Sequence, residues 1–119
     1  MRPSQKLAIL LEAEANKILP RDFTFHGCGR PVLIRQMVAA AMRELCPSLS
    51  LRNLSSVVGY SNAANLCGGL RVFRARFAKN CWVCDFQIEL LEAAQDCHFG
   101  LIRQINAACL FHANSRRAA

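Results

Sequence analysis

The residues best suited to chemistry are cysteines and histidines in the C-terminal half, where Cys81-Trp82-Val83-Cys84 is followed by Cys97-His98. Thiolate and imidazole are ligands of tetrahedral zinc, and two cysteines separated by two residues suit such a site. These cysteines fall on and between expected helices, however, and Trp82 is interpreted as a core anchor. We therefore predict no metal, and we interpret the seven cysteines as reduced, half-buried packing residues.

A cysteine and a histidine can also act as a nucleophile and its base, provided that the fold brings them together. No further pattern in the sequence marks an oxyanion site, and Glu89 and Glu92 are interpreted as a solvated helix face. The sequence accordingly predicts no enzyme, no catalytic residue, no cofactor and no small-molecule substrate.

A third set of residues, polar and basic, lies mainly between Leu49 and Phe77. Asparagine amides can bond adenine, serine hydroxyls can reach phosphates or base edges, and Arg and Lys neutralise phosphates. The predicted contacts to double-stranded DNA are Arg35, Arg52, Ser61, Asn62, Ala64, Asn65, Gly68, Arg71, Arg74 and Lys79. The alternatives are helix capping for the serine and asparagines and a solvated face for the cations, among which Arg76 is the weakest candidate.

Composition agrees with a nucleic-acid partner. The 119 residues, 53% of them apolar, suffice for one domain with one core, and a net charge of +7 favours an anionic partner over a neutral one. The alternatives are an acidic membrane surface or a merely solubilising surface. No apolar run reaches the roughly 18 residues of a membrane span, and no export signal is recognisable. We expect a cytoplasmic, nucleoid-associated protein.

The elements that must position these residues are helical. The first helix is expected to start with Ser4 as N-cap and to end before Pro20, and a loop over 21–30 follows. Pro31 lies in the first turn of a second helix that continues to Leu45 and is closed by Pro47. No strand or repeat is recognisable, so the expected fold is a single small all-α domain over residues 1–119.

Two helices joined by a tight turn follow. Ser50 is expected to cap a short helix through Val58, Gly59 and Tyr60 make the turn, and Ser61 is expected to cap the next helix. Helices joined in this way are typical of the helix-turn-helix. The apolar stripe expected on the second of them consists of Leu66, Leu70, Phe73 and Phe77, opposite Ala64, Asn65, Gly68, Arg71 and Lys79.

Glycines interrupt that second helix. Gly68 and Gly69 each cost a helix about 1 kcal/mol relative to alanine. They indicate close approach of the helix backbone to a neighbouring element or to DNA. The alternative is slack, that is, loose packing in which the glycines have no specific role. Two further helices are expected, one from Val83 and a last one over Leu101–Phe111 after Gly100, with a mobile tail over residues 115–119.

Residues across the middle of the chain resemble a known family. They are Arg35-Gln36-Met37, Ala41, Glu44, Leu45, Leu49-Ser50-Leu51, Leu54, Val58, Gly59, Leu66 and Arg71. The pattern resembles the C-terminal DNA-binding domain of the bacterial replication initiator DnaA over about residues 30–93. The resemblance implies a DnaA-like helix-turn-helix with its second helix in the major groove. The chain has extra N- and C-terminal helices beyond this pattern, and we expect them to complete the core or to pair two copies in a homodimer.

The chain departs from that family at its base-reading motif. The family's Gly-Arg-Asp-His-Thr-Thr is replaced by Tyr60-Ser61-Asn62-Ala63-Ala64-Asn65, and Leu33 replaces its minor-groove arginine. The matched residues include no counterpart of the family's ATPase domain. Val58 to Asn65 also resembles the helix-turn-helix of AraC-type regulators, without their downstream Phe and Arg spacing. The predicted function is a transcription factor or chromosome-associated regulator; the alternative is a protein-interaction adaptor that has lost specific DNA binding.

Overall fold

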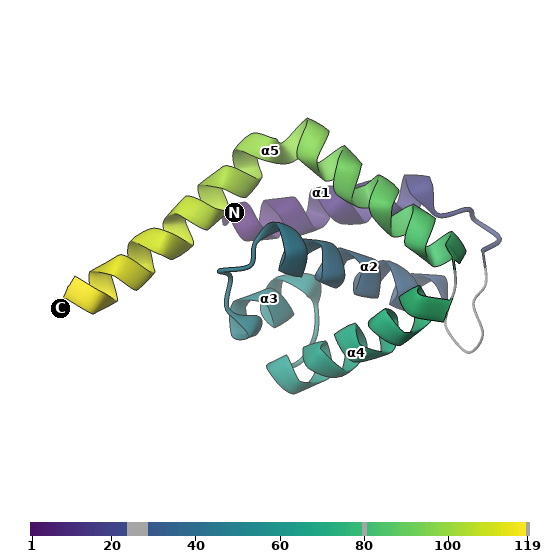
Figure 1. The fold of residues 1–119 in the computed structure, drawn as a ribbon, viewed down its shortest axis with the longest axis horizontal. Helices are drawn as coiled ribbons and strands as arrows, with labels where there is room; N and C mark the ends of the chain where they lie inside the picture. Colours follow the sequence, from purple (N-terminus) through teal and green to yellow (C-terminus); the bar gives the residue numbers. More distant parts are fainter. Residues whose placement is uncertain (24–28, 80, 119) are drawn as a thin grey trace.

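The computed structural model describes residues 1–23, 29–79 and 81–118, and over these residues it consists of five helices without a strand (Figure 1). The helices are α1 (Pro3–Ile18), α2 (Arg30–Leu45), α3 (Leu51–Val58), α4 (Ala63–Lys79) and α5 (Cys81–Ala118). The prediction of a small all-α protein is confirmed. Residues 24–28 of the predicted loop lie outside the described residues, and the loop ends one residue early because Arg30 already belongs to α2.

Helix boundaries follow local rules at most ends. The N-cap of α3 is Ser50, whose Oγ accepts the Asn53 N–H at 3.1 Å, and its C-cap is Gly59 with a φ of 89°. Ser4 as the cap of α1 was wrong, because the helix already begins at Pro3. There the side-chain Oε1 of Gln5 reaches back and accepts the Arg2 N–H at 3.1 Å.

Helix α2 is the centre of the molecule and packs against each of the other four helices. Nine of its sixteen residues are buried, spread around the whole helix: Leu33, Ile34, Gln36, Met37, Val38, Ala39, Ala41, Met42 and Leu45. Its run of small alanines lets neighbouring helices approach from several sides. The buried apolar residues of all five helices join in one hydrophobic cluster.

Arg30 ties the start of α2 to the end of α1. Its guanidinium donates to Asn16 Oδ1 at 2.7 Å, to the Asn16 carbonyl at 2.9 Å and to the Leu19 carbonyl at 3.0 Å. The last carbonyls of a helix lack hydrogen-bond partners within the helix, and the negative end of the helix dipole lies there. A guanidinium at this end donates to the carbonyls and interacts favourably with the dipole. These hydrogen bonds hold the start of α2 against the end of α1.

Helix α5 is bent. His98 has non-helical dihedral angles (φ −127°, ψ 21°), which divide α5 into two helical segments. The sequence predicted two helices separated at Gly100, so the break lies at a position two residues earlier. The first segment arches over α1 and α2, and the second continues beyond the helical core (Figure 1). The mobile tail stays a prediction, since α5 continues to Ala118 and Ala119 lies outside the described residues.

None of the helices in the described ranges combines the length and the apolar character that crossing a membrane requires.

Candidate nucleic-acid interface

The connection between α3 and α4 is a tight turn formed by residues 59–62. The Ser55 carbonyl accepts the Gly59 N–H at 3.1 Å and the Tyr60 N–H at 2.9 Å, which closes the end of α3. Tyr60 then lies against α4: a Cβ built on Gly69 would be 2.6 Å from its Oη and 3.1 Å from two ring carbons. Of the three explanations given above for Gly69, close approach to a neighbouring element therefore holds.

The N-terminus of α4 is capped by Asn62. Its Oδ1 accepts the Asn65 N–H at 2.8 Å, so the prediction of Ser61 as the cap was wrong by one residue. Ser61 instead accepts a hydrogen bond from Asn65 Nδ2 at 2.6 Å. All three side chains are exposed. Within the described residues, Asn62 Nδ2 and Asn65 Oδ1 have no partner, and these atoms remain to bond a ligand.

Helix α4 has the two predicted faces. Leu66, Leu70 and Phe73 are buried and Phe77 is half-buried against the core, which confirms the apolar stripe. On the opposite face Ala64, Asn65, Arg71 and Lys79 are exposed. Gly68 is half-buried on this side, and a Cβ added there would meet no described atom within 4 Å. Unlike Gly69, Gly68 thus has no internal contact that explains it.

Three residues of this outer face were missed by the sequence analysis. Val72, Ala75 and Ala78 are exposed between the cations of α4. A helical wheel at 100° per residue places them among Ala64, Gly68 and Arg71, so periodicity was a signal that could have found them. The centre of the face consists mainly of small side chains, which leave the α4 backbone accessible.

The candidate cations differ in their surroundings. Arg71, Arg74 and Lys79 on α4 and Arg52 on α3 are exposed and pair with no carboxylate among the described residues. Arg35 on α2 is also exposed, and its guanidinium carbon lies 5.8 Å from the centre of the Tyr60 ring. This contact places a cation of α2 beside the turn between α3 and α4.

Arg76 points the other way. Its Nη1 donates to Oε1 of the buried Gln36 at 3.3 Å, so this arginine connects α4 to α2. This inward position of Arg76 agrees with its ranking as the weakest candidate for a DNA contact. Leu33 is only 1% exposed, and a side chain at that position is therefore part of the core.

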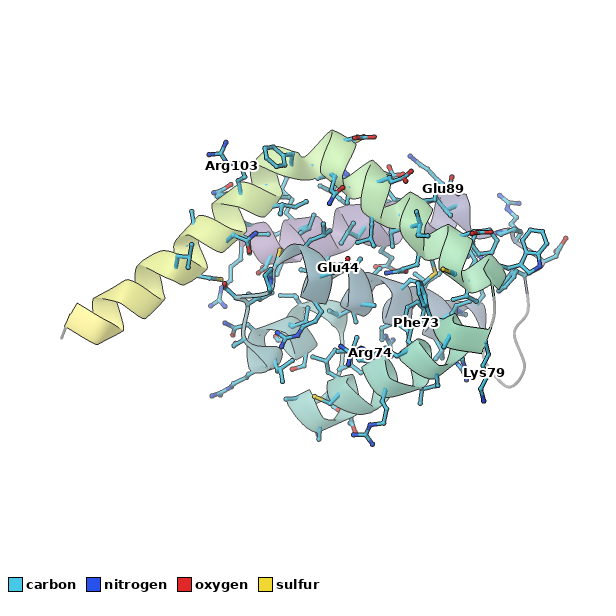
Figure 2. All side chains as sticks on the ribbon, viewed as in Figure 1. Glu44, Phe73, Arg74, Lys79, Glu89 and Arg103 are labelled. Carbon is cyan, nitrogen blue, oxygen red and sulfur yellow. The ribbon has the colours of Figure 1, made fainter. Side chains whose placement is uncertain are left out.

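Charge is divided between two regions of the chain. Residues 45–84 contain five Lys and Arg and no Asp or Glu, whereas residues 85–100 contain Asp85, Glu89, Glu92 and Asp96 and no Lys or Arg. These four carboxylates are all exposed on α5. In Figure 2, Arg74 and Lys79 lie on α4 at one edge of the molecule, and Glu89 lies on α5 across the core from them. This distribution of charge favours the approach of an anion to α4 over its approach to the first segment of α5.

Among the described residues, the cysteines do not form a set of metal ligands. Cys84 is half-buried and Cys97 is exposed, and in the described part of the chain no three His, Cys, Asp or Glu side chains are grouped as metal ligands would be. Cys28 and the Cys81 side chain lie outside the described residues. The interpretation of Trp82 as a core anchor was wrong, because this side chain is 65% exposed. Burial, and secondarily the neighbouring Cys109, raises the pKa of Cys46 to about 11, so this thiol stays protonated at neutral pH.

No protein-family model, curated protein or solved structure matches this chain.

Proposed function

We propose that the protein binds double-stranded DNA through the outer face of α4, as a transcription factor or chromosome-associated regulator with a DnaA-like helix-turn-helix. The observation that carries this proposal is the division of charge. Three exposed cations lie on α4 and a fourth on α3, and residues 45–84 contain no carboxylate that would oppose a phosphate. A cytoplasmic, nucleoid-associated location is part of the same proposal.

Each part of the face has a distinct task in this proposal. Arg71 and Lys79 neutralise phosphates along α4, with Arg52, Arg74 and Arg35 beside them, and counterion release makes the affinity salt-dependent. The uncharged residues at the start of α4 enter the major groove deepest. There Asn62 Nδ2 donates to base acceptors and Asn65 Oδ1 accepts from base amino groups.

The test is a fluorescence-anisotropy titration with a labelled random-sequence duplex at several salt concentrations. Arg71→Ala is expected to lower the slope of log affinity against log salt by about one, as the loss of one phosphate contact does. Arg103→Ala is the matched control, because Arg103 is exposed on α5 and stacks on Phe99, with 5.7 Å between its guanidinium carbon and the ring centre. Binding without salt dependence, or equal effects of the two variants, would refute the proposal.

The alternative, a protein-interaction adaptor without specific DNA binding, is favoured by one observation. Leu33 stands where the resembled family has its minor-groove arginine, and its side chain is buried in the core. No cation is available at that position. Selection of bound duplexes from a random pool distinguishes the two functions, since an adaptor enriches no sequence.

A further inference from the structure

A groove lies between α2, α4 and α5, and it shares one residue, Arg74, with the proposed DNA face. It has a volume of about 380 Å³, within the range of about 300–1,000 Å³ that small-molecule sites occupy. Its apolar wall contains two aromatic rings, Phe73 and Phe77, with centres 6.1 Å apart. The full lining is Ala40, Arg43, Glu44, Leu70, Phe73, Arg74, Phe77, Gln87 and Leu91. Phe73 is only 2% exposed and Phe77 is half-buried, so the wall offers an aromatic ligand mainly the Phe77 ring.

Gln87 adds a polar group to this apolar wall. The residue is only 4% exposed, and its Nε2 donates to the Met37 carbonyl at 3.0 Å, which orients the amide. Its Oε1 is buried and accepts no hydrogen bond from any described residue. Buried acceptors are nearly always paired, so this one is open to a donor from outside the chain, either a water or a ligand. The terminal amide torsion of glutamine is broad, so Oε1 can turn toward the groove when Nε2 releases the Met37 carbonyl.

The rim of the groove is charged. Arg43 and Arg74 lie there with Glu44, which leaves one positive charge in excess. Arg74 is exposed and has no carboxylate partner in the described part of the chain, while Arg43 Nη1 makes only a long contact of 3.4 Å with the Pro47 carbonyl. Figure 2 shows Glu44 on α2 and Phe73 and Arg74 on α4 around this space. A guanidinium fork in this position fits a carboxylate.

We propose that this groove is the binding site of a small organic anion, with an aromatic body, a carboxylate for Arg74 and an N–H or O–H donor for Gln87 Oε1. The aromatic body lies against the half-buried Phe77, and the carboxylate remains at the rim. The site shares Arg74 with the proposed DNA face, so the probes are titrated without DNA.

Three probes separate these interactions in an NMR titration of the full chain. Indole-3-acetate has the aromatic body, the donor and the carboxylate; 1-naphthaleneacetate lacks the donor, and 3-methylindole lacks the carboxylate. Indole-3-acetate is expected to bind saturably and to shift resonances of residues that line the groove. Each of the other probes is expected to bind about threefold to tenfold more weakly, as the loss of one hydrogen bond or ion contact allows.

Two variants connect each preference to its residue. Gln87→Met is expected to remove the preference for indole-3-acetate over 1-naphthaleneacetate. Arg74→Gln is expected to remove the preference for indole-3-acetate over 3-methylindole. Lys6→Gln, at an exposed position of α1 outside the groove, is expected to keep both preferences. Because Gln87→Met also loses the bond to Met37, the probe comparison on the unaltered protein serves as an independent test. The proposal is overturned if no probe saturates, if the three probes bind equally well, or if a folded Gln87→Met variant keeps its preference for the donor.

Discussion

Adjacent glycines in α4 allow the same substitution to be tested in opposite environments. Replacing either glycine by alanine raises helix propensity by about 1 kcal/mol. At Gly68 the new methyl group meets nothing within 4 Å, so Gly68→Ala should keep this whole gain. At Gly69 it would lie 2.6 Å from Tyr60 Oη, well inside the usual contact distance. Overpacking of this kind costs about 1–3 kcal/mol, so the net effect of Gly69→Ala should be a loss of about 1 kcal/mol.

Urea denaturation followed by circular dichroism measures both values, with unchanged m-values as the check that unfolding stays two-state. The expected difference between the variants is therefore about 2 kcal/mol. In a Tyr60→Phe background the closest atom is gone, and the cost of Gly69→Ala should shrink in a double-mutant cycle. If Gly69→Ala stabilises the protein as much as Gly68→Ala does, the packing of Tyr60 against α4 is refuted.

Gly68→Ala also tests whether the open space at Gly68 permits close approach of DNA. If the α4 backbone approaches DNA closely, Gly68→Ala should weaken DNA binding while it raises stability, since the methyl group separates the two surfaces. Gly100→Ala is the matched control, because a Cβ added to Gly100 on α5 also meets no described atom within 4 Å and lies outside the proposed interface. Equal DNA affinities for Gly68→Ala and Gly100→Ala would indicate that Gly68 is merely slack.

The remaining predictions concern the start of α4 and the cysteines. Asn62→Ala should destabilise the protein by about 1 kcal/mol because the cap is lost, whereas Asn62→Asp should keep the cap but weaken DNA binding by charge repulsion. Asn65→Ala should cost roughly 1–3 kcal/mol on a selected site and little on random duplex in a competition assay; an unchanged ratio would make Asn65 a structural residue only. At a pH near the ordinary cysteine pKa, iodoacetamide should alkylate Cys97 and spare Cys46 in the folded protein, with peptide mass spectrometry as the readout. The pKa of Cys46 is higher in the folded than in the unfolded state. The protonated thiol therefore contributes fully to folding stability below a pH of about 9, and this contribution is lost as the pH rises toward about 11. A chelator should leave the melting temperature unchanged; one bound zinc per chain and a collapse on chelation would contradict that expectation.

Local physical chemistry determined the helices and most of their ends. Pro31 lies in the first turn of α2, and α3 begins after Ser50 and ends before Gly59, as the residue preferences predict. The buried stripe of α4 follows from helical periodicity, which depends only on the spacing of its apolar residues. These features depend on neighbours within about one helical turn, and for that reason one sequence suffices to predict them.

The tertiary structure decided what each polar group and glycine does. Asn62 rather than Ser61 caps α4, a choice of one residue between two good capping types. Gly69 meets Tyr60 while Gly68 meets nothing, and Arg76 turns inward to Gln36 while Arg71 stays exposed. Each outcome depends on a contact between residues that the packing of α2, α3 and α4 brings together. Periodicity assigns a residue to a face, but only the packed helices determine what that face meets.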